Sequence, residues 1–352
     1  MLNFPLPCTG LAAHNGAYVV PKIRVTGEER VFTLPEFSFE SGERIRELKV
    51  GYASHGRLSA AKDNAVLLVP GTANTRHSAD GYIGPGNALD PDHDFIIAVD
   101  AIGAGTSSSP AGGLGGDFPR YSIRDMVKAE HALIAALGVT RLKAVVGASM
   151  GAFQALEWGI AHPAAAERLV LLVPSTRAGN VFRSVVKAAI EAIQLDPAWN
   201  GGRYTRQPLA GLRAAGRIYY PWTVADAYLE QLTPQALEAE LAGTVERAAA
   251  WDAWSFIRRY EASSSHDVSL PFGGDMAKAL GRVRAATLVL PSATDRLLGV
   301  ETAREIARLV PHARYAEIPS ARGHLGWRAV PGSAETRFIV DSVAGFLSRR
   351  ID

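Results

Sequence analysis

The chain has 352 residues, of which 47% are hydrophobic and 20% are charged, and its formal net charge at neutral pH is +2. A net charge this close to zero gives no broad basic or acidic surface. The composition therefore does not favour a nucleic-acid or anionic-lipid partner, and it leaves the fold and the enzyme class open. The length exceeds that of a usual single domain, and we expect one large core with an insertion, or two domains.

The single cysteine, Cys8, excludes an intrachain disulfide and any metal site built from several cysteines. This usage fits a reducing compartment. The first residues show no basic segment before an apolar run, and no later segment reaches the roughly 18 apolar residues that span a bilayer. We therefore expect a cytoplasmic protein without membrane contact, and we leave a homodimer open.

Short apolar runs rich in β-forming residues alternate with helical patterns along the chain. The predicted strands cover residues 65–69, 95–99, 144–146, 169–173 and 287–290, and a strand-like stretch follows at 314–318. Strands that are apolar on both faces and alternate with helices are typical of a mostly parallel sheet covered on both sides. The sequence therefore predicts an α/β architecture.

Capping residues and apolar spacing mark the helices that would cover this sheet. Ser122 and Asp125 have the spacing of a capping box, and the pattern after them predicts a helix that ends at Gly138. Similar patterns predict helices over 152–161, from 300 to 310 before Pro311, and near 339–347.

Residues 177–270 interrupt the alternation of strands and helices. Turn signals such as Asp196-Pro197 separate helical segments there, and no convincing strand is present. We expect a helical cap at 177–270, inserted into a core domain formed by 1–176 and 271–352. The cap holds four of the six tryptophans, which either pack its interior or form the roof of an apolar substrate pocket: Trp199, Trp222, Trp251 and Trp254.

A serine between two glycines follows the predicted strand at 144–146. Gly147-Ala-Ser-Met-Gly151 has the G-x-S-x-G pattern, and a helical pattern follows directly. The small flanking residues permit a tight strand-to-helix turn that holds the serine at the edge of an α/β-hydrolase sheet. Ser149 is therefore the candidate nucleophile, whereas Ser107 and its serine neighbours lie in a glycine-rich loop without this context.

A serine hydroxyl attacks at neutral pH only when a base takes its proton and an acid orients that base. Asp295 follows the predicted strand at 287–290, and His324 follows the stretch at 314–318. Both therefore lie at the carboxyl ends of late strands, at the same edge as Ser149 and in the order Ser, Asp, His. We expect Asp295 to orient His324 as the base; the alternatives are a helix-capping aspartate and a loop histidine.

A tetrahedral oxyanion needs two backbone N–H donors. We expect one from Met150 and the other from Thr72, which lies in the Pro-Gly-Thr turn after the strand at 65–69. No group of His, Asp or Glu has metal-ligand spacing, and the glycines at 112–116 lack a phosphate-binding pattern. We expect no metal and no bound cofactor, with acyl-CoA left open as a co-substrate.

Several longer strings can be compared with known families. They are Gly84-Pro-Gly-Asn-Ala-Leu89, Phe118-Pro119 with Ser122-Ile-Arg-Asp-Met126, Val146-Gly-Ala-Ser-Met-Gly151 with Gln154-Ala-Leu-Glu-Trp158, and Gly323-His324. These strings resemble the homoserine O-acetyltransferase family of the α/β-hydrolase superfamily. The resemblance implies that Ser149, Asp295 and His324 form a triad that passes an acyl group through an acyl-serine to an acceptor. It also places on Arg217 the cap arginine that binds the amino-acid acceptor.

Two positions depart from that family. The acetyltransferases have an aspartate after the catalytic histidine that helps to hold the acceptor's amino group, and this chain has Leu325 there. A leucine cannot replace a charge-assisted hydrogen bond, typically worth about 1.5 to 3 kcal/mol, so affinity for homoserine should be much reduced. The turn at Thr72 also resembles that of an ordinary hydrolase more than the family's His-Ala-Leu-like string.

The leading hypothesis is therefore a hydrolase of small carboxylic esters that uses an acyl-serine. The alternative is an O-acyltransferase that moves an acetyl or other acyl group from acyl-CoA to a hydroxyl acceptor. A third, from another class, is a binding protein that keeps the fold without catalysis, although all three triad candidates are present.

Overall fold

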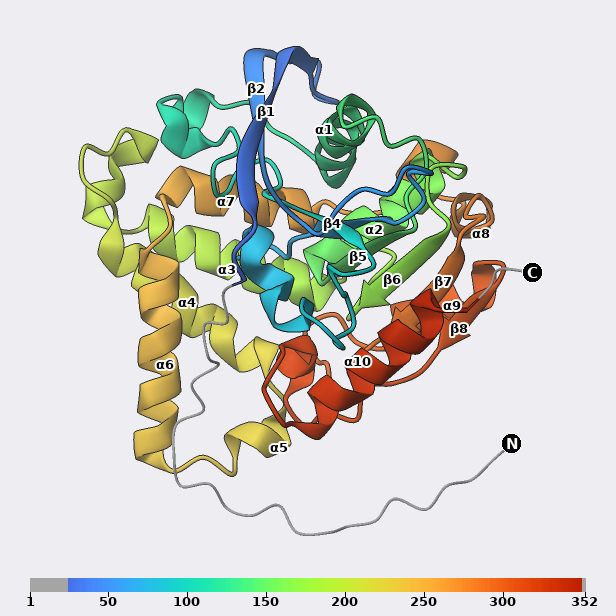
Figure 1. The fold of residues 1–352 in the computed structure, drawn as a ribbon. Helices are drawn as coiled ribbons and strands as arrows, with labels where there is room; N and C mark the ends of the chain where they lie inside the picture. The colour runs from blue at the N-terminus through green and yellow to red at the C-terminus, as the bar shows by residue number, and fades with distance from the viewer. Residues whose placement is uncertain (1–24, 350–352) are drawn as a thin grey trace.

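The computed structural model describes residues 25–349, and Cys8 with the rest of the N-terminal segment lies outside the described residues. A sheet of eight strands forms its centre, in the order β1-β2-β4-β3-β5-β6-β7-β8 (Figure 1). The strands are β1 (Glu28–Ser38), β2 (Arg44–His55), β3 (Ala65–Val69), β4 (Phe95–Val99), β5 (Ala144–Ala148), β6 (Arg168–Leu172), β7 (Ala286–Leu290) and β8 (Ala313–Tyr315).

The parallel part of the sheet agrees with the sequence prediction. Strands β3 and β4 have the predicted bounds, and β5, β6 and β7 differ from them by one or two residues at an end. Strand β8 is shorter than the predicted stretch, although Ile318 still forms a parallel bridge with Ser292. All of these strands are parallel to their neighbours from β4 to β8. The predicted α/β architecture is confirmed.

An antiparallel hairpin at the N-terminal edge was not predicted. Strand β1 pairs with β2, and β2 pairs with β4, both antiparallel. Phe37 is the one residue of β1 that is buried, so the strand lacks the apolar pattern by which the central strands were recognised. The hairpin makes the sheet mixed.

Helices cover both faces of the sheet. The helices of the core are α1 (Ile123–Ala136), α2 (Met150–Ala161), α8 (Met276–Leu280), α9 (Glu301–Leu309) and α10 (Ala334–Leu347). Apolar residues of α1, α2, α8 and α9, among them Met126, Leu156 and Ile306, share one buried cluster with one face. Val343 and Phe346 of α10 belong to the cluster on the other face. The capping box that starts α1 is present, since the Ser122 hydroxyl accepts from the Asp125 N–H at 3.1 Å.

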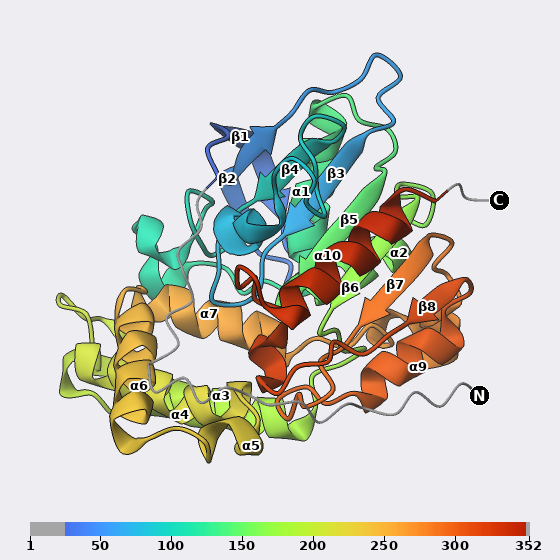
Figure 2. The same ribbon diagram turned by 60° about the horizontal axis from the view of Figure 1, so that its bottom comes forward.

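A group of helices separates β6 from β7 in the chain. They are α3 (Asn180–Gln194), α4 (Leu209–Thr223), α5 (Asp226–Leu229), α6 (Pro234–Ala249) and α7 (Ala253–Ser264). Figure 2 shows them gathered beyond one end of the sheet. Helices α3, α4 and α7 share a separate apolar cluster, in which the Trp199 and Trp254 ring centroids lie 4.7 Å apart. We call these helices the cap; its division from the core at residues 177 and 270 stays a prediction.

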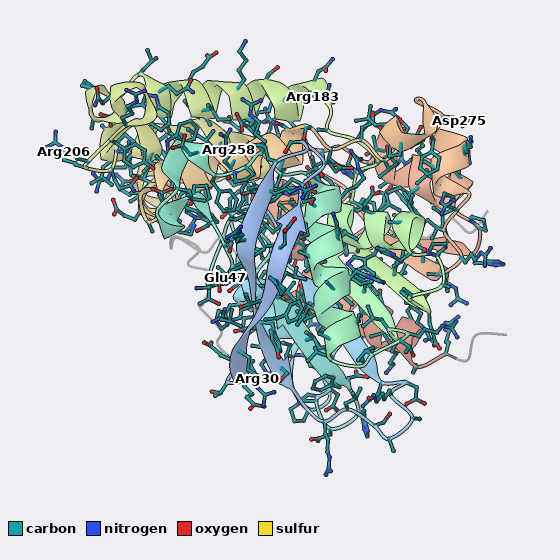
Figure 3. The ribbon with its side chains drawn as sticks, turned by 90° about the horizontal axis from the view of Figure 1, so that it is seen from above. Arg30, Glu47, Arg183, Arg206, Arg258 and Asp275 are labelled. Carbon is teal, nitrogen blue, oxygen red and sulfur yellow. The ribbon has the colours of Figure 1, made fainter. Side chains whose placement is uncertain are left out.

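Charged side chains lie mainly on the outside of the molecule. Arg30 and Glu47 of the β1–β2 hairpin and Arg206 of the cap are exposed and point outward (Figure 3). Among the helices of residues 25–349, none combines the length and apolar character required to cross a membrane.

Candidate active site

Ser149 lies on a sharp turn between β5 and α2. Its φ of 58° and ψ of −122° are unusual for a residue with a side chain, and α2 begins at the next residue. The turn requires both of its glycines. A Cβ on Gly147 would lie 2.1 Å from the Gly151 carbonyl oxygen, and one on Gly151 would lie 2.3 Å from that of Val69. The strained turn directs Ser149 out of the carboxyl edge of the sheet.

Asp295 and His324 reach the same edge from later strands. They follow β7 and β8, which run parallel to β5 and β6. His324 Nε2 lies 2.8 Å from Ser149 Oγ, and His324 Nδ1 lies 2.7 Å from Asp295 Oδ2. The structure therefore brings the three predicted residues into one hydrogen-bonded chain.

The hydrogen bonds of Asp295 determine which groups donate and which accept in that chain. Its Oδ1 accepts from the N–H groups of Leu297 and Leu298 at 2.9 and 3.1 Å, and both the carboxylate and the imidazole are buried. An ionised carboxylate can only accept, so His324 Nδ1 is the donor and Nε2 is left to accept from Ser149. This is the tautomer that a general base requires.

A threonine joins the two loops that carry Asp295 and His324. Thr294 Oγ1 donates to the Ser320 carbonyl at 2.7 Å and accepts from the Gly323 N–H at 3.0 Å. Gly323 has a φ of +60°, and a Cβ there would lie 2.6 Å from the backbone of Val224, just after α4. The loop that carries His324 therefore lies close against the cap, and this close approach with a positive φ requires glycine at position 323.

The predicted oxyanion donors, Thr72 and Met150, belong to two segments that contact each other. A Cβ on Gly71 would lie 3.3 Å from the Ala148 carbonyl and 3.8 Å from Ser149 Cβ, so the turn after β3 lies against the nucleophile. Within residues 25–349, neither the Thr72 N–H nor the Met150 N–H donates a hydrogen bond. Met150 opens α2, where an N–H has no acceptor inside the helix. Both amides are thus available to a developing oxyanion, and their role stays a prediction.

A fully buried arginine of the cap holds this turn, which the sequence did not reveal. Arg259, on α7, is 0% exposed and all five of its N–H groups donate to backbone carbonyls. Its acceptors, at 2.7 to 3.2 Å, are the carbonyl oxygens of Gly71, Thr72, Asn74, Ala101 and Ile102. Arg259 therefore fixes the position of the Thr72 amide from the side of the cap.

We expect Arg259→Met to lower kcat by about 10²-fold, the effect of losing one oxyanion donor, while KM changes little. Five carbonyls would lose their donors and the turn would be free to move. Steady-state kinetics with circular dichroism as a folding check measures this. Arg258→Met is the matched control, because Arg258 bonds to Glu261 and to the Gly116 carbonyl instead of the turn. Equal kinetics for the two variants would contradict the positioning role.

A cavity of about 120 Å³, which we call the inner cavity, opens at Ser149. Core and cap both contribute to its walls. Among its lining residues are Thr72, Ser149, Tyr219, Arg247, Trp251, Phe256, Tyr260, His324, Leu325 and Arg328. Trp251 thus lines the cavity that opens at Ser149, whereas Trp199 and Trp254 pack against each other. Leu325 also faces this space, directly beside the candidate base.

The structure does not bring Arg217, the predicted acceptor-binding arginine, to the inner cavity. Arg217 is exposed and does not line the inner cavity. On α4 the cavity face is formed by Ala215, Gly216, Tyr219, Tyr220 and Thr223. Because each residue adds about 100° around the helix axis, these five form one stripe, and Arg217 lies beyond its edge.

Two other arginines line the inner cavity instead. Arg247 lies on α6, one turn before Trp251, and Arg328 lies four residues after His324. The first lies four residues before Trp251, although α6 ends at Ala249 and the two residues do not share a helix. The second follows a short 3₁₀ helix, Gly323–Trp327, whose direction the sequence did not indicate.

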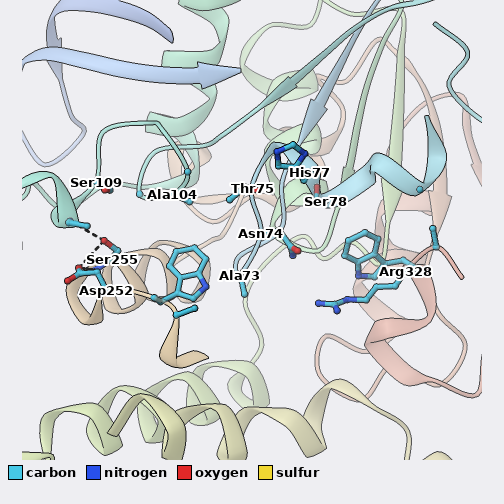
Figure 4. A pocket seen from close by; sticks show the side chains of 18 residues that line it. Ala73, Asn74, Thr75, His77, Ser78, Ala104, Ser109, Asp252, Ser255 and Arg328 are labelled. Atoms are coloured by element: carbon cyan, nitrogen blue, oxygen red, sulfur yellow. Dashed lines mark hydrogen bonds between the residues drawn. The ribbon is translucent and has the colours of Figure 1, made fainter. Parts of the chain in front are cut away.

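A second, more polar cavity of about 490 Å³ adjoins the first, and we call it the outer cavity. Asn74, Trp251 and Arg328 line both. Figure 4 shows Asp252 and Ser255 on one side of the outer cavity and Arg328 on the other. In the part of the chain that the structure describes, no group of three or more His, Cys, Asp or Glu is placed to hold a metal ion.

The strand–serine–helix turn, the Ser–His–Asp chain and the sheet order define a protein of the α/β-hydrolase class, and a family model described as alpha/beta hydrolase fold matches residues 64–326. A homoserine O-acetyltransferase of Leifsonia xyli subsp. xyli is 34% identical over 345 residues, covering 85% of each chain. An ethyl acetate hydrolase of Pseudomonas veronii is 32% identical, covering 85% of this chain and 90% of that one. The chain belongs to the homoserine O-acetyltransferase-like family of α/β-hydrolases.

A solved structure supports the same grouping. The acetyl esterase MekB superposes with a TM-score of 0.86 at 30% identity, covering 92% of this chain and 97% of that one. The family thus contains proteins named as esterases and proteins named as acetyltransferases, so membership alone does not choose between the two activities.

Proposed function

We propose that this protein hydrolyses small carboxylic esters through an acyl-serine intermediate on Ser149. The observation that carries the proposal is the hydrogen-bonded chain from Ser149 through His324 to Asp295, which opens into a cavity lined by Leu325. The inner cavity of about 120 Å³ favours a small acyl group, since sites for drug-sized ligands measure roughly 300 to 1,000 Å³.

The reaction follows from the geometry. Ser149 Oγ attacks the ester carbonyl as its proton moves to His324 Nε2, and Asp295 stabilises the imidazolium that forms. The amides of Thr72 and Met150 donate to the oxyanion. His324 then protonates the leaving alcohol, and the acyl group remains on Ser149. A water molecule, deprotonated by the same imidazole, attacks the acyl-serine and releases the acid.

Leu325 favours water over an amino-acid acceptor in the second half of this cycle. The side chain lines the inner cavity beside the base, where an acceptor would approach. The charged residues that also line it, Arg247 and Arg328, are cationic and would repel an ammonium group. Among the described residues that line the inner cavity, none is a carboxylate that could pair with a cationic amine. The relatives named ethyl acetate hydrolase and acetyl esterase agree with an ester substrate.

The second candidate is O-acyl transfer from acyl-CoA to a hydroxyl acceptor. It is favoured by the identity of 34% to a protein named homoserine O-acetyltransferase. The same acyl-serine would form, and an alcohol would replace water in the second step. Coenzyme A would then be a product and not a bound cofactor. The cytoplasmic location and the homodimer stay predictions.

Two assays on one preparation separate these activities. The protein is incubated with p-nitrophenyl acetate and, separately, with acetyl-CoA, each with and without homoserine, beside a Ser149→Ala control. Ester hydrolysis that ignores homoserine and disappears in the control is the expected result. Thiol release that depends on homoserine would contradict hydrolysis and establish transfer.

Labelling with a fluorophosphonate tests for the non-catalytic alternative. The probe reacts with serines that an adjacent base activates, so we expect modification of Ser149, identified by peptide mass. Folded protein that stays unlabelled and turns over no ester would leave a binding protein as the remaining interpretation.

A further inference from the structure

Two guanidinium groups line the inner cavity without a carboxylate that neutralises them. Within residues 25–349, the guanidinium of Arg328 makes no hydrogen bond and no ion pair, and that of Arg247 donates only to the Thr244 hydroxyl, at 2.7 Å. Arg328 also lines the outer cavity, where Figure 4 shows its side chain extending into the space. Arg328 is partly buried and Arg247 is exposed at the cavity. An unpaired charge on a partly buried group is unfavourable unless a ligand compensates it.

The groups around this pair leave an excess of positive charge. Arg322 and Tyr260 are also near Arg328, and Arg322 packs against Tyr228. Glu240 attracts Arg247 electrostatically, and its oxygens accept from the hydroxyls of Tyr220 and Tyr228. Glu240 is therefore already engaged by two tyrosine hydroxyls beside Arg247.

The charge of Arg328 persists at neutral pH. Burial, together with repulsion by Arg247 and Arg322, lowers the pKa of Arg328 to about 10. Partial desolvation by neighbouring atoms also lowers the pKa of Arg247 from its ordinary value, although the residue is exposed. A group with a pKa of about 10 is still almost fully protonated at pH 7. The two arginines are thus cations in the folded protein.

We propose that the inner cavity selects esters that carry an anionic group, a carboxylate above all, and that Arg328 and Arg247 bind this group while Ser149 attacks the ester carbonyl. The inference rests on the proposed function and names its substrate class. Guanidinium groups bind carboxylates through parallel hydrogen bonds, which orients a small ester as well as holding it. Leu325 fits this substrate because it offers nothing to a cation and does not repel an anion.

Matched pairs of esters test the proposal and show which part of the substrate bears the charge. One pair is 4-acetoxybenzoate and its methyl ester, with the anion in the alcohol part. The other is mono-4-nitrophenyl fumarate and its methyl ester, with the anion in the acyl part. For at least one pair we expect a higher kcat/KM for the anion, and Arg328→Gln should reduce the ratio of anion to neutral ester by about 10- to 100-fold.

Three further variants make the result specific. Arg328→Lys keeps a charge and should restore part of the ratio, and Arg247→Gln should reduce it as Arg328→Gln does. Arg217→Gln, an exposed arginine of the same cap, should leave the ratio unchanged. Wild-type protein that prefers the neutral ester in both pairs, or a ratio that Arg328→Gln does not alter, would overturn the proposal.

A binding measurement separates this inference from the proposed function. Calorimetry with benzoate and with benzamide is done on Ser149→Ala, which requires no turnover. We expect benzoate to bind more tightly, and the preference to disappear when Arg328→Gln is added. Benzoate preference without ester hydrolysis by the wild type would overturn only the proposed function. Hydrolysis without benzoate preference would overturn only the inference.

Discussion

Ser149→Ala is expected to lower kcat for p-nitrophenyl acetate by about 10⁵- to 10⁶-fold, and adding His324→Ala should cost almost nothing further. The two side chains are 2.8 Å apart and act on one proton, so either loss removes the same step. The residual rate should still exceed the rate in water, because the Thr72 and Met150 amides remain in place. Single and double variants measured under identical conditions show this non-additivity.

The control for this experiment is the serine that competes with Ser149 in the sequence. Ser107 is buried, accepts from the Gly51 N–H at 2.9 Å and bonds to the Asp100 carbonyl, away from any histidine. Ser107→Ala should therefore change kcat by less than about tenfold. Losses that add in the Ser149 and His324 double variant would mean that the two residues act independently, contrary to a shared proton transfer.

The strands and the candidate triad could be predicted because local signals specify them. Buried parallel strands have continuous apolar runs, and β3 and β4 have the predicted bounds for that reason. Two glycines and a serine between a strand and a helix permit few backbone paths. Once the strands are known, parallel topology places Ser149, Asp295 and His324 at one edge without any long-range information.

The contacts between cap and core could not be predicted because no local pattern records them. Arg259 looks like an ordinary helix residue in sequence, yet its acceptors lie more than 150 positions away, at Gly71 and Ala101. The family resemblance assigns acceptor binding to Arg217, but whether this side chain reaches the cavity depends on the rotation of α4 about its axis. The edge strand β1 is mostly exposed and therefore lacks the apolar pattern of the central strands.

Asp295→Asn should lower kcat by about 10⁴-fold while the fold is retained, because it reverses the histidine tautomer. The direction of the new side chain is fixed by the backbone. Two N–H groups, of Leu297 and Leu298, point at the Asp295 oxygen farther from His324, so the asparagine carbonyl must face them. Its NH₂ group then donates to His324 Nδ1, the ring proton moves to Nε2, and Nε2 can no longer accept from Ser149.

Kinetics beside a thermal melt test this expectation, with Asp94→Asn as the matched control. Asp94 is also a buried carboxylate, but it pairs with Lys143, and both residues immediately precede strands, at the amino edge of the sheet. We expect kcat of Asp94→Asn to stay within a few-fold of wild type even if its melting temperature falls. A tenfold or smaller loss in folded Asp295→Asn would show that His324 keeps its tautomer without the carboxylate, and the orienting role would pass to the loop bonds of Thr294 and Gly323.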